Sequence, residues 1–364
     1  MDPLSIRTLL GRTPGLTAAQ ALELVSAAGG DIARAIDPDV LQRVTLSPRS
    51  RTCLTNPDRV VVDSDLEWLD TSGVKLVAAF DPAYPPALAE LPAGPPVLFV
   101  LGDPHVLVTP QIAMVGARNA TAQGCRTARQ FAQSFATAGV TVTSGLAIGI
   151  DAHSHMGALS AGGATVAVVA TGLDRIYPTQ HAALARRIAA QGALVSRFPP
   201  GTAPLRGHFP LRNELISGLS RATLVVEAAQ RSGSLVTAAH ARRQGRIVFA
   251  LPGPAGVSSS AGCHLLIRAG AVLVEHPAQV LHELKIPHVK ERLAHRSRRS
   301  AAPAVMDKAS EMLLDAVGFE PATVDMLAVR TGLTGESIAS RLLVLELQGH
   351  IASYPGGRYG RIPR

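Results

Sequence analysis

The chain has 364 residues, a formal net charge of +8 and a mean hydropathy of +0.21, and its length accommodates two or three domains. No apolar run approaches the roughly 20 residues of a membrane span, and the N-terminus lacks a signal-peptide pattern, so we expect a cytoplasmic protein without membrane contact. The three cysteines are widely spaced, which excludes a disulfide framework and a zinc site, and we expect neither a metal nor a cofactor.

Positive charge is concentrated in the middle of the chain. Residues 1–110 contain 8 basic and 13 acidic residues, whereas residues 111–284 contain 15 and 6. Residues 285–305 contain 6 basic residues and 1 acidic residue, and residues 306–364 contain 6 basic and 7 acidic residues. The middle part and the segment after it are therefore expected to face a polyanion. Only 4 of the 35 basic residues are lysine. Arginine suits bidentate phosphate binding, although a GC-rich genome gives the same bias.

Residues 1–79 are predicted to form a small helical domain. Short helical runs between Leu4 and Ile36 are separated by turns at residues 13–15 and 29–30, and Thr17 is placed to cap the second run. The pattern is similar to a helix–hairpin–helix or SAM-like unit. Its acidic surroundings favour a structural or protein-contact role over contact with DNA.

Residues 80–284 are predicted to form an α/β domain. It opens with an extended, proline-rich segment, residues 80–110, which we interpret as a wrapped linker. Apolar strand-like runs then alternate with helix-like runs, which predicts a parallel sheet covered on both faces. Ligands of such sheets bind at the carboxyl ends of the strands. The predicted strands are Ile112–Val115, Val140–Ser144, Thr165–Ala170, Ala193–Ser196, Ala222–Val226, Ile247–Ala250 and Val272–Val274.

The remaining sequence predicts a linker and a second, smaller domain. Residues 285–305 are basic and rich in small residues, which is typical of a flexible linker. Residues 306–364 read as three helices and a β-hairpin that turns at Pro355–Gly357, the pattern of a winged helix. Because this domain is slightly acidic, binding to double-stranded DNA and binding to protein both stay open as its role.

Two glycine turns follow the first two predicted strands of the α/β domain. In VGARNAT, Gly116 permits a sharp turn before a helix that starts near Thr121, and Arg118 is placed to reach a phosphate or to lie in solvent. In SGLAIGIDAHSHMGAL, Gly145 permits close backbone approach. Asp151 and His155 share a helix face while His153 points away, which disfavours a metal site and favours a capping or polar-packing role for the first two.

The stretch from Phe209 to Pro254 contains six arginines but only two carboxylates, Glu214 and Glu227. Arg206 precedes it in a predicted loop over residues 199–210, and Arg212 is predicted to open the next helix. Phe209 is placed either to stack on a base or to plug the core under the loop.

After the strand that ends at Val226, the run Ser232-Gly233-Ser234 starts a helix and offers free N–H groups and hydroxyls to an anion. Neither a nucleophile elbow nor a phosphate-binding P-loop motif occurs in the sequence. The pattern therefore favours a binding site over a catalytic one.

Six ordered motifs together closely resemble the DNA-processing protein A family (DprA, also called Smf). The match covers residues 80 to 275 approximately, and the domains on either side agree with those of the family in type and order. The six motifs are VGARNAT, SGLAIGIDAHSHMGAL, ATGLDRIYP, FPLRNELISGLS, VVEAAQRSGSLVTAAHARRQGRIVFALPG and SSAGCHLLIRAGA.

The resemblance implies a Rossmann-like domain that binds single-stranded DNA, forms a homodimer and loads the RecA recombinase during natural transformation, without being an enzyme. It implies that a basic pocket takes the strand. The matched positions are Gly116, Arg118, Gly145, Arg206, Phe209, Arg212, Ser232 and Gly233. The sequence departs from the family pattern at three positions, where it has Glu214 in place of an arginine, His264 in place of an asparagine and His153 in place of a small residue.

An enzyme is the alternative to a single-strand binder. Rossmann-like phosphoribohydrolases cleave nucleotide N-glycosidic bonds, and Glu227 is the candidate carboxylate for that reaction. That class uses a Pro-Gly-Gly-x-Gly-Thr type of run, which this sequence does not show beside the pocket. A third hypothesis, a winged-helix regulator with a nucleotide sensor, needs a basic recognition helix, and the C-terminal domain is not basic.

Overall fold

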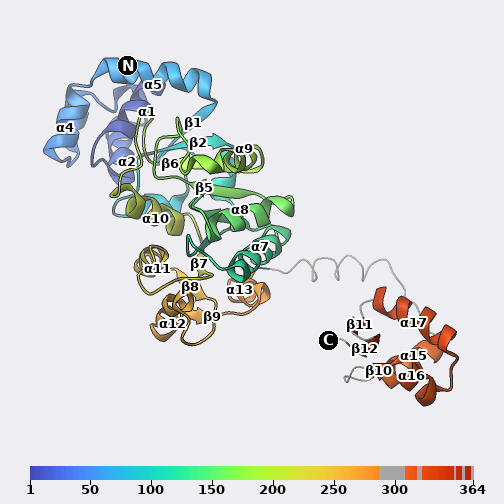
Figure 1. The fold of residues 1–364 in the computed structure, drawn as a ribbon. Coiled ribbons are helices and arrows are strands. Elements are labelled where there is room, and N and C mark those ends of the chain that lie inside the picture. Colours follow the sequence, from blue (N-terminus) through green and yellow to red (C-terminus); the bar gives the residue numbers. More distant parts are fainter. Residues whose placement is uncertain (287–307, 318–321, 348–349, 355–356, 362–364) are drawn as a thin grey trace. The chain divides into compact units, whose positions relative to one another are not determined.

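The computed structural model describes residues 1–286, 308–317, 322–347, 350–354 and 357–361. The chain divides into two compact units, Met1–Arg292 and Leu293–Arg364 (Figure 1). The predicted linker, residues 285–305, lies outside the described residues except for its first two. The boundaries of the four predicted segments stay predictions.

Five helices open the first unit: α1 (Pro3–Arg12), α2 (Ala18–Ala27), α3 (Pro38–Arg43), α4 (Pro48–Thr55) and α5 (Arg59–Ser72). The predicted cap is confirmed, because the Thr17 side chain accepts from the Gln20 N–H and the Gln20 side chain accepts from the Thr17 N–H. The helices bury an aliphatic cluster that includes Ile6, Leu10 and Leu24. Burial of this apolar surface stabilises the packing of these helices.

A nine-stranded sheet forms the centre of the first unit, in the order β1-β2-β6-β5-β4-β3-β7-β8-β9. All seven predicted strands are confirmed, and they pair in parallel. Their bounds are β3 (Gln111–Val115), β4 (Thr141–Ser144), β5 (Thr165–Val168), β6 (Ala193–Ser196), β7 (Ala222–Val225), β8 (Ile247–Ala250) and β9 (Val272–Leu273).

Helices cover both faces of this sheet, as expected for parallel strands (Figure 1). One buried cluster joins the sheet to α10, α11 and α12, and two others join it to α7, α8, α9 and α13. The bounds of these helices are α7 (Ala122–Thr137), α8 (Ile150–Ser160), α9 (Ala182–Gln191), α10 (His208–Gly218), α11 (Ser234–Arg243), α12 (Ala261–Arg268) and α13 (Pro277–Glu283). This arrangement confirms the Rossmann-like α/β fold.

The interpretation of residues 80–110 as a linker is wrong for their second half. Strand β2 (Val97–Gly102) lies in the sheet, antiparallel to β6 and to β1 (Val74–Ala78), with a short helix, α6 (Pro86–Ala89), between β1 and β2. Four consecutive side chains, Val97 to Val100, are completely buried. The prolines on either side of this run suggest a linker in the sequence. Prolines are tolerated at the ends of strands, however, and the run forms one strand of a hairpin with β1.

The sheet reverses its winding direction between β3 and β7. The chain runs from β3 outward through β4, β5 and β6, and from β7 in the opposite direction through β8 and β9. The crevice outside the carboxyl ends of the strands at such a switch point is where open α/β sheets bind ligands. The loops that follow these strands carry the residues that the sequence motifs singled out.

The second unit has the predicted winged-helix pattern. Helices α15 (Lys308–Val317), α16 (Val324–Thr331) and α17 (Gly335–Leu347) pack around a core that includes Leu313, Leu327 and Leu342. A three-stranded sheet of β10 (Ala322–Thr323), β12 (Arg358–Arg361) and β11 (Ile351–Tyr354) completes the unit. Within the described part of the chain, no helix combines the length and apolar character needed to cross a bilayer.

Candidate nucleic-acid interface

The predicted site residues converge at the carboxyl edge of the sheet. A groove of about 770 Å³, which we call the arginine groove, is lined by seven of the eight: Gly116, Arg118, Arg206, Phe209, Arg212, Ser232 and Gly233. The eighth, Gly145, lines a smaller adjoining cavity of about 150 Å³. Arg118, Phe209 and Arg212 line both. The structure therefore brings all eight together from five separate loops and helix starts, although the DNA contacts themselves stay a prediction.

Gly145 and Arg212 form the floor of the site. A Cβ atom at Gly145 would overlap the guanidinium of Arg212, so any larger residue there would force the buried arginine side chain to move. Arg212 is 5% exposed, its Nη1 donates to the Val168 carbonyl at 3.2 Å, and its buried Nε has no hydrogen-bond partner in the described residues. Burial lowers the pKa of Arg212, an effect that the nearby Asp151 carboxylate opposes. Arg212 thus contributes positive potential from below rather than an exposed phosphate ligand.

Asp151 holds the backbone of the glycine turn. Its Oδ2 accepts from the Gly145 N–H at 3.1 Å and from the Ala147 N–H at 3.4 Å. Burial raises the pKa of Asp151, and Arg212 opposes that rise. His155 Nδ1 lies 2.7 Å from the Thr165 hydroxyl. The predicted polar-packing roles of Asp151 and His155 are confirmed. Among the described residues, no three His, Cys, Asp or Glu side chains are grouped so that they could hold a metal ion.

Phe209 lies in the first turn of α10, because that helix begins at His208 and not at Arg212 as predicted. Its ring is half-buried, with the guanidinium carbons of Arg118 and Arg212 at 5.4 and 5.9 Å from its centroid. The Tyr177 ring meets it edge-on at a centroid separation of 6.1 Å. Phe209 therefore lines the groove as an aromatic wall and does not plug the core.

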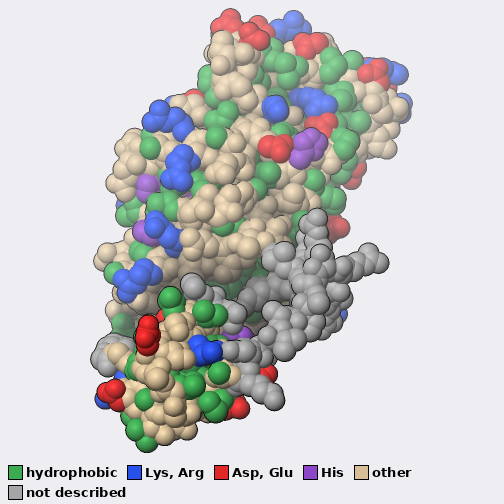
Figure 2. Space-filling model, turned by 90° about the vertical axis from the view of Figure 1, so that its right-hand side faces the viewer, with side chains coloured by type: hydrophobic (Ala, Val, Ile, Leu, Met, Phe, Trp, Pro, Cys, Tyr) green, Lys and Arg blue, Asp and Glu red, His purple; other side chains and the backbone are tan. Residues whose placement is uncertain are grey.

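Exposed cations line the same groove as Phe209. Arg118, Arg206 and Arg231 are all exposed and all line the arginine groove, whereas Asp151 is the one carboxylate among its described lining residues and is buried. Arg231 was absent from the predicted set, although it immediately precedes the Ser-Gly-Ser run. Figure 2 shows acidic and basic side chains intermixed over the N-terminal helices, and a row of Lys and Arg side chains along one side of the sheet region. Such a groove attracts a polyanion.

The start of α11 also lines the groove. Ser232 and Ser234 share a hydrogen bond between their hydroxyls of 2.7 Å, and the Ser234 N–H donates to the Ser232 hydroxyl at 3.3 Å. Gly233 is exposed between them, and a Cβ there would meet nothing. The positive end of the helix dipole adds to the charge of the arginines at this point.

Glu227, the candidate catalytic carboxylate, faces a different cavity of about 540 Å³. It is 7% exposed, and its Oε2 accepts from the Thr121 N–H at 2.9 Å at the start of α7. The carboxylate is thus occupied in capping a helix, and it does not line the arginine groove. This position disfavours the N-glycosidase alternative.

The three departures from the family pattern have local contacts. His264 Nε2 lies 2.9 Å from the Gly253 carbonyl, and His153 Nδ1 lies 2.9 Å from that of Gly149. Glu214 is half-buried and acts electrostatically on Arg197 and His240. Glu214 does not line the arginine groove, so the change from arginine leaves the described groove without an added negative charge.

Comparison with known proteins identifies the family. The model of the DNA recombination-mediator protein A family matches residues 75–285, and that of the DprA winged helix domain matches residues 297–357. The chain belongs to the DprA/Smf family. Protein Smf of Escherichia coli K12 is 44% identical over 337 residues, which cover 90% of this chain and 88% of that protein. DNA processing protein DprA of Streptococcus pneumoniae R6 is 42% identical over 205 residues, 56% of this chain and 72% of that protein.

Two solved DprA structures resemble this family member. The X-ray structure of DprA from Streptococcus pneumoniae superposes with a TM-score of 0.67 at 33% identity and covers 78% of this chain and 98% of that one. A Helicobacter pylori DprA structure, described as giving insights into a single-stranded DNA binding mode, has a TM-score of 0.53 at 27% identity, with 58% and 95% covered. The family resemblance drawn from the six motifs is therefore confirmed.

Proposed function

We propose that this DprA family member binds single-stranded DNA in the arginine groove, protects it, and delivers it to the RecA recombinase in the cytoplasm during natural transformation. The observation that carries the proposal is a groove that the exposed Arg118, Arg206 and Arg231 line together with the half-buried ring of Phe209. A solved structure of a Helicobacter pylori relative, described as giving insights into its single-stranded DNA binding mode, supports it.

The groove chemistry suits a flexible, unpaired strand. The exposed arginines would neutralise successive phosphates, and the N–H groups at the start of α11 would hold another. Phe209 would stack on a base, which requires an unpaired nucleotide and is tolerant of sequence. Binding should therefore show weak sequence preference and a steep dependence on salt.

We propose a binding protein rather than an enzyme. A general base must lie within hydrogen-bond reach of its substrate, but the carboxylate of the groove, Asp151, is buried beneath the glycine turn. Glu227 caps α7 and faces the separate cavity. We further propose a homodimer that presents two grooves, with RecA on its outer surface, and a winged helix that contacts either double-stranded DNA or protein.

The test is fluorescence anisotropy of labelled oligothymidine across a salt series, with the wild type, Arg118→Ala and Arg221→Ala. Arg221 is an exposed arginine before β7, at the opposite edge of the sheet, and serves as the matched control. We expect Arg118→Ala to weaken binding about tenfold or more and to reduce the slope of log Kd against log salt by about 0.7 per lost phosphate contact. Arg221→Ala should leave both unchanged.

Two outcomes would overturn the proposal. Wild-type affinity that does not change from low to moderate salt would exclude phosphate recognition, and equal losses in both variants would exclude the groove. Release of free base from a nucleoside monophosphate would instead favour the N-glycosidase. RecA delivery needs its own assay, which measures the lag before RecA filaments grow on single-stranded DNA coated with a single-strand-binding protein. We expect the wild-type protein to shorten this lag and Arg118→Ala to leave it unchanged.

A further inference from the structure

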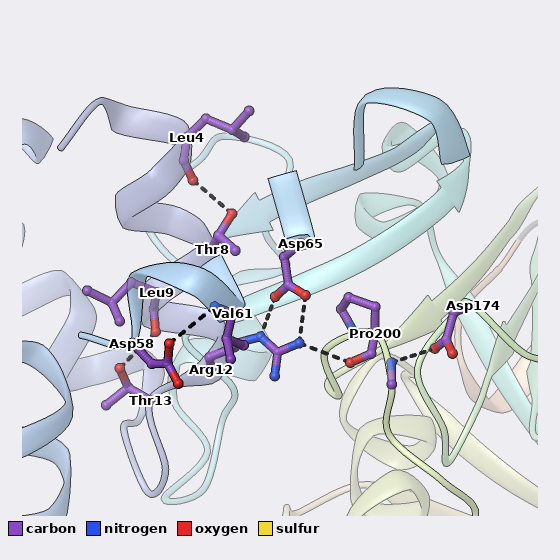
Figure 3. A network of polar contacts seen from close by, with 11 residues as sticks. Leu4, Thr8, Leu9, Arg12, Thr13, Asp58, Val61, Asp65, Asp174 and Pro200 are labelled. Carbon is purple, nitrogen blue, oxygen red and sulfur yellow. Dashed lines mark hydrogen bonds and ion pairs between the residues drawn. The ribbon is translucent and has the colours of Figure 1, made fainter. Parts of the chain in front are cut away.

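The loop that carries Arg206 is bound by the N-terminal helices. This rim loop, residues 197–207, connects β6 to α10. Arg12, the last residue of α1, donates from Nη2 to the Pro200 carbonyl in the rim loop at 3.1 Å. Figure 3 shows Arg12 lying between Asp65 of α5 and Pro200, with its guanidinium directed at both. A residue of the acidic N-terminal region thus contacts the loop that carries Arg206, a lining residue of the arginine groove.

The Arg12 guanidinium is held in place by a second partner, Asp65, as well as by the loop. Its Nε and Nη2 both contact the Asp65 carboxylate, the second at 2.6 Å, in a two-point ion pair. The Asp65 side chain is 5% exposed and that of Arg12 is 26% exposed. Because both side chains are largely shielded from water and joined at two points, the donor that faces Pro200 is held in one orientation.

The other side of the rim loop is held by the segment that follows β5. The Gly201 N–H donates to Asp174 Oδ1 at 3.0 Å, and the Gly172 N–H donates to the Thr202 carbonyl at 3.1 Å. A Cβ at Gly172 would overlap the Pro199 carbonyl, so the two backbones are in close contact. The rim loop is therefore fixed between α1 and the segment of residues 171–178.

Both fixed segments lead to the groove. Arg206 follows Pro200 by six residues and lines the groove, while Tyr177 belongs to the segment that Asp174 anchors and packs against Phe209. A shift of the rim loop would therefore displace a phosphate ligand. It would also loosen the ring that supports the aromatic wall.

We infer that Arg12 and Asp65 are positioning residues for DNA binding, through which the N-terminal helices set the geometry of the arginine groove. The inference rests on the proposed function of that groove. It gives the N-terminal domain a role in affinity without any contact between that domain and DNA.

The test compares Arg12→Ala with Arg7→Ala. Arg7 lies on the same helix and pairs with Asp81, with similar exposure of 22% and 19%, but its described contacts do not reach the rim loop. We expect Arg12→Ala to weaken oligothymidine binding about three- to tenfold, the size of coupling between neighbouring residues. It should also accelerate amide hydrogen exchange at Gly201. Arg7→Ala should do neither.

A double-mutant cycle separates positioning from simple destabilisation. If Arg12 acts through Arg206, the loss caused by Arg12→Ala should shrink when Arg206→Ala is already present. Additive losses, or an unchanged Kd in folded Arg12→Ala despite faster exchange at Gly201, would overturn the inference. If Arg12→Ala does not fold, Arg12→Lys decides the matter, because a lysine keeps a positive charge beside Asp65 but lacks the fork that pairs with Asp65 at two points and also reaches the Pro200 carbonyl. A loss that is non-additive with Arg206→Ala supports the inference, and no loss overturns it.

The two proposals fail in different ways. A wild-type protein that does not bind oligothymidine, or that binds it independently of Arg118, would contradict the function of the groove. A wild-type protein that binds through Arg118 while Arg12→Ala binds equally well would contradict only the positioning role.

Discussion

At the scale of single residues, the site depends on a glycine, which has no side chain. Gly145 leaves the space that Arg212 fills, and Arg212 places its charge beneath Phe209. The sequence motifs predicted that both residues belong to the site. They did not predict that Arg212 is buried, because its burial depends on a glycine that lies 67 residues earlier in the chain and on the fold that brings the two together.

Phe209 gives the sharpest test at this scale. Replacing it with leucine keeps an apolar side chain but removes the π-face, so we expect a loss of about 1–2 kcal/mol in oligothymidine binding, roughly tenfold in Kd. The salt slope should stay as in the wild type, because no phosphate contact is removed. Phe209→Tyr is the control and should bind nearly as well as the wild type. A reduced salt slope in Phe209→Leu would show that the ring acts by placing Arg118.

At the scale of elements, the buried histidine of α8 predicts a pH dependence. Burial lowers the pKa of His155 from 6.5 to about 3, so the folded chain keeps it neutral while the unfolded chain protonates it. Its contribution to stability is therefore fully present above about pH 6.5 and is lost as pH falls toward 3. Between pH 6.5 and 5 the loss is about 2 kcal/mol.

Urea unfolding followed by the fluorescence of Trp68, the one tryptophan, measures this effect in the first unit. His155→Gln keeps a polar partner for Thr165 but does not titrate. The free energy of unfolding of this variant should fall less between pH 6.5 and 5 than that of the wild type, by about 2 kcal/mol. Equal pH dependence in the two proteins would mean that His155 is not the residue responsible.

A second element-scale prediction concerns the start of α7. Glu227→Gln removes the negative charge that faces the helix N-terminus but keeps an oxygen that accepts from Thr121. We expect a loss of about 1 kcal/mol in unfolding free energy and unchanged oligothymidine binding. Unchanged stability combined with lost base-releasing activity would instead assign Glu227 a catalytic role.

The elements also show where sequence reasoning succeeds. Strands β3 to β9 were predicted because short apolar runs alternate with helical ones, and a parallel sheet requires that pattern. Strand β2 was missed because its neighbours, Pro95, Pro96 and Pro104, suggest a linker, while its partner β6 lies far along the chain. Local pattern carries no information on a pairing of that span.

At the scale of the whole molecule, the two units divide the chain into a part that contains the arginine groove and a winged helix. We expect a chain of residues 1–286 to retain Arg118-dependent binding, because every described residue of the groove lies within it. Anisotropy with truncated wild type and truncated Arg118→Ala measures this. Binding that vanishes on truncation would assign the principal contact to residues 287–364.

The antiparallel pairing of β2 with β6 has a consequence for biosynthesis. Phe99 pairs with Ser196, so the ribosome adds about 100 residues after β2 before its partner exists. At about 5–20 residues per second this takes on the order of 5–20 s. During that time one edge of a strand whose side chains are buried in the finished fold has no neighbour. The nascent chain therefore exposes a site for chaperones, or for mispairing, well before the groove can form.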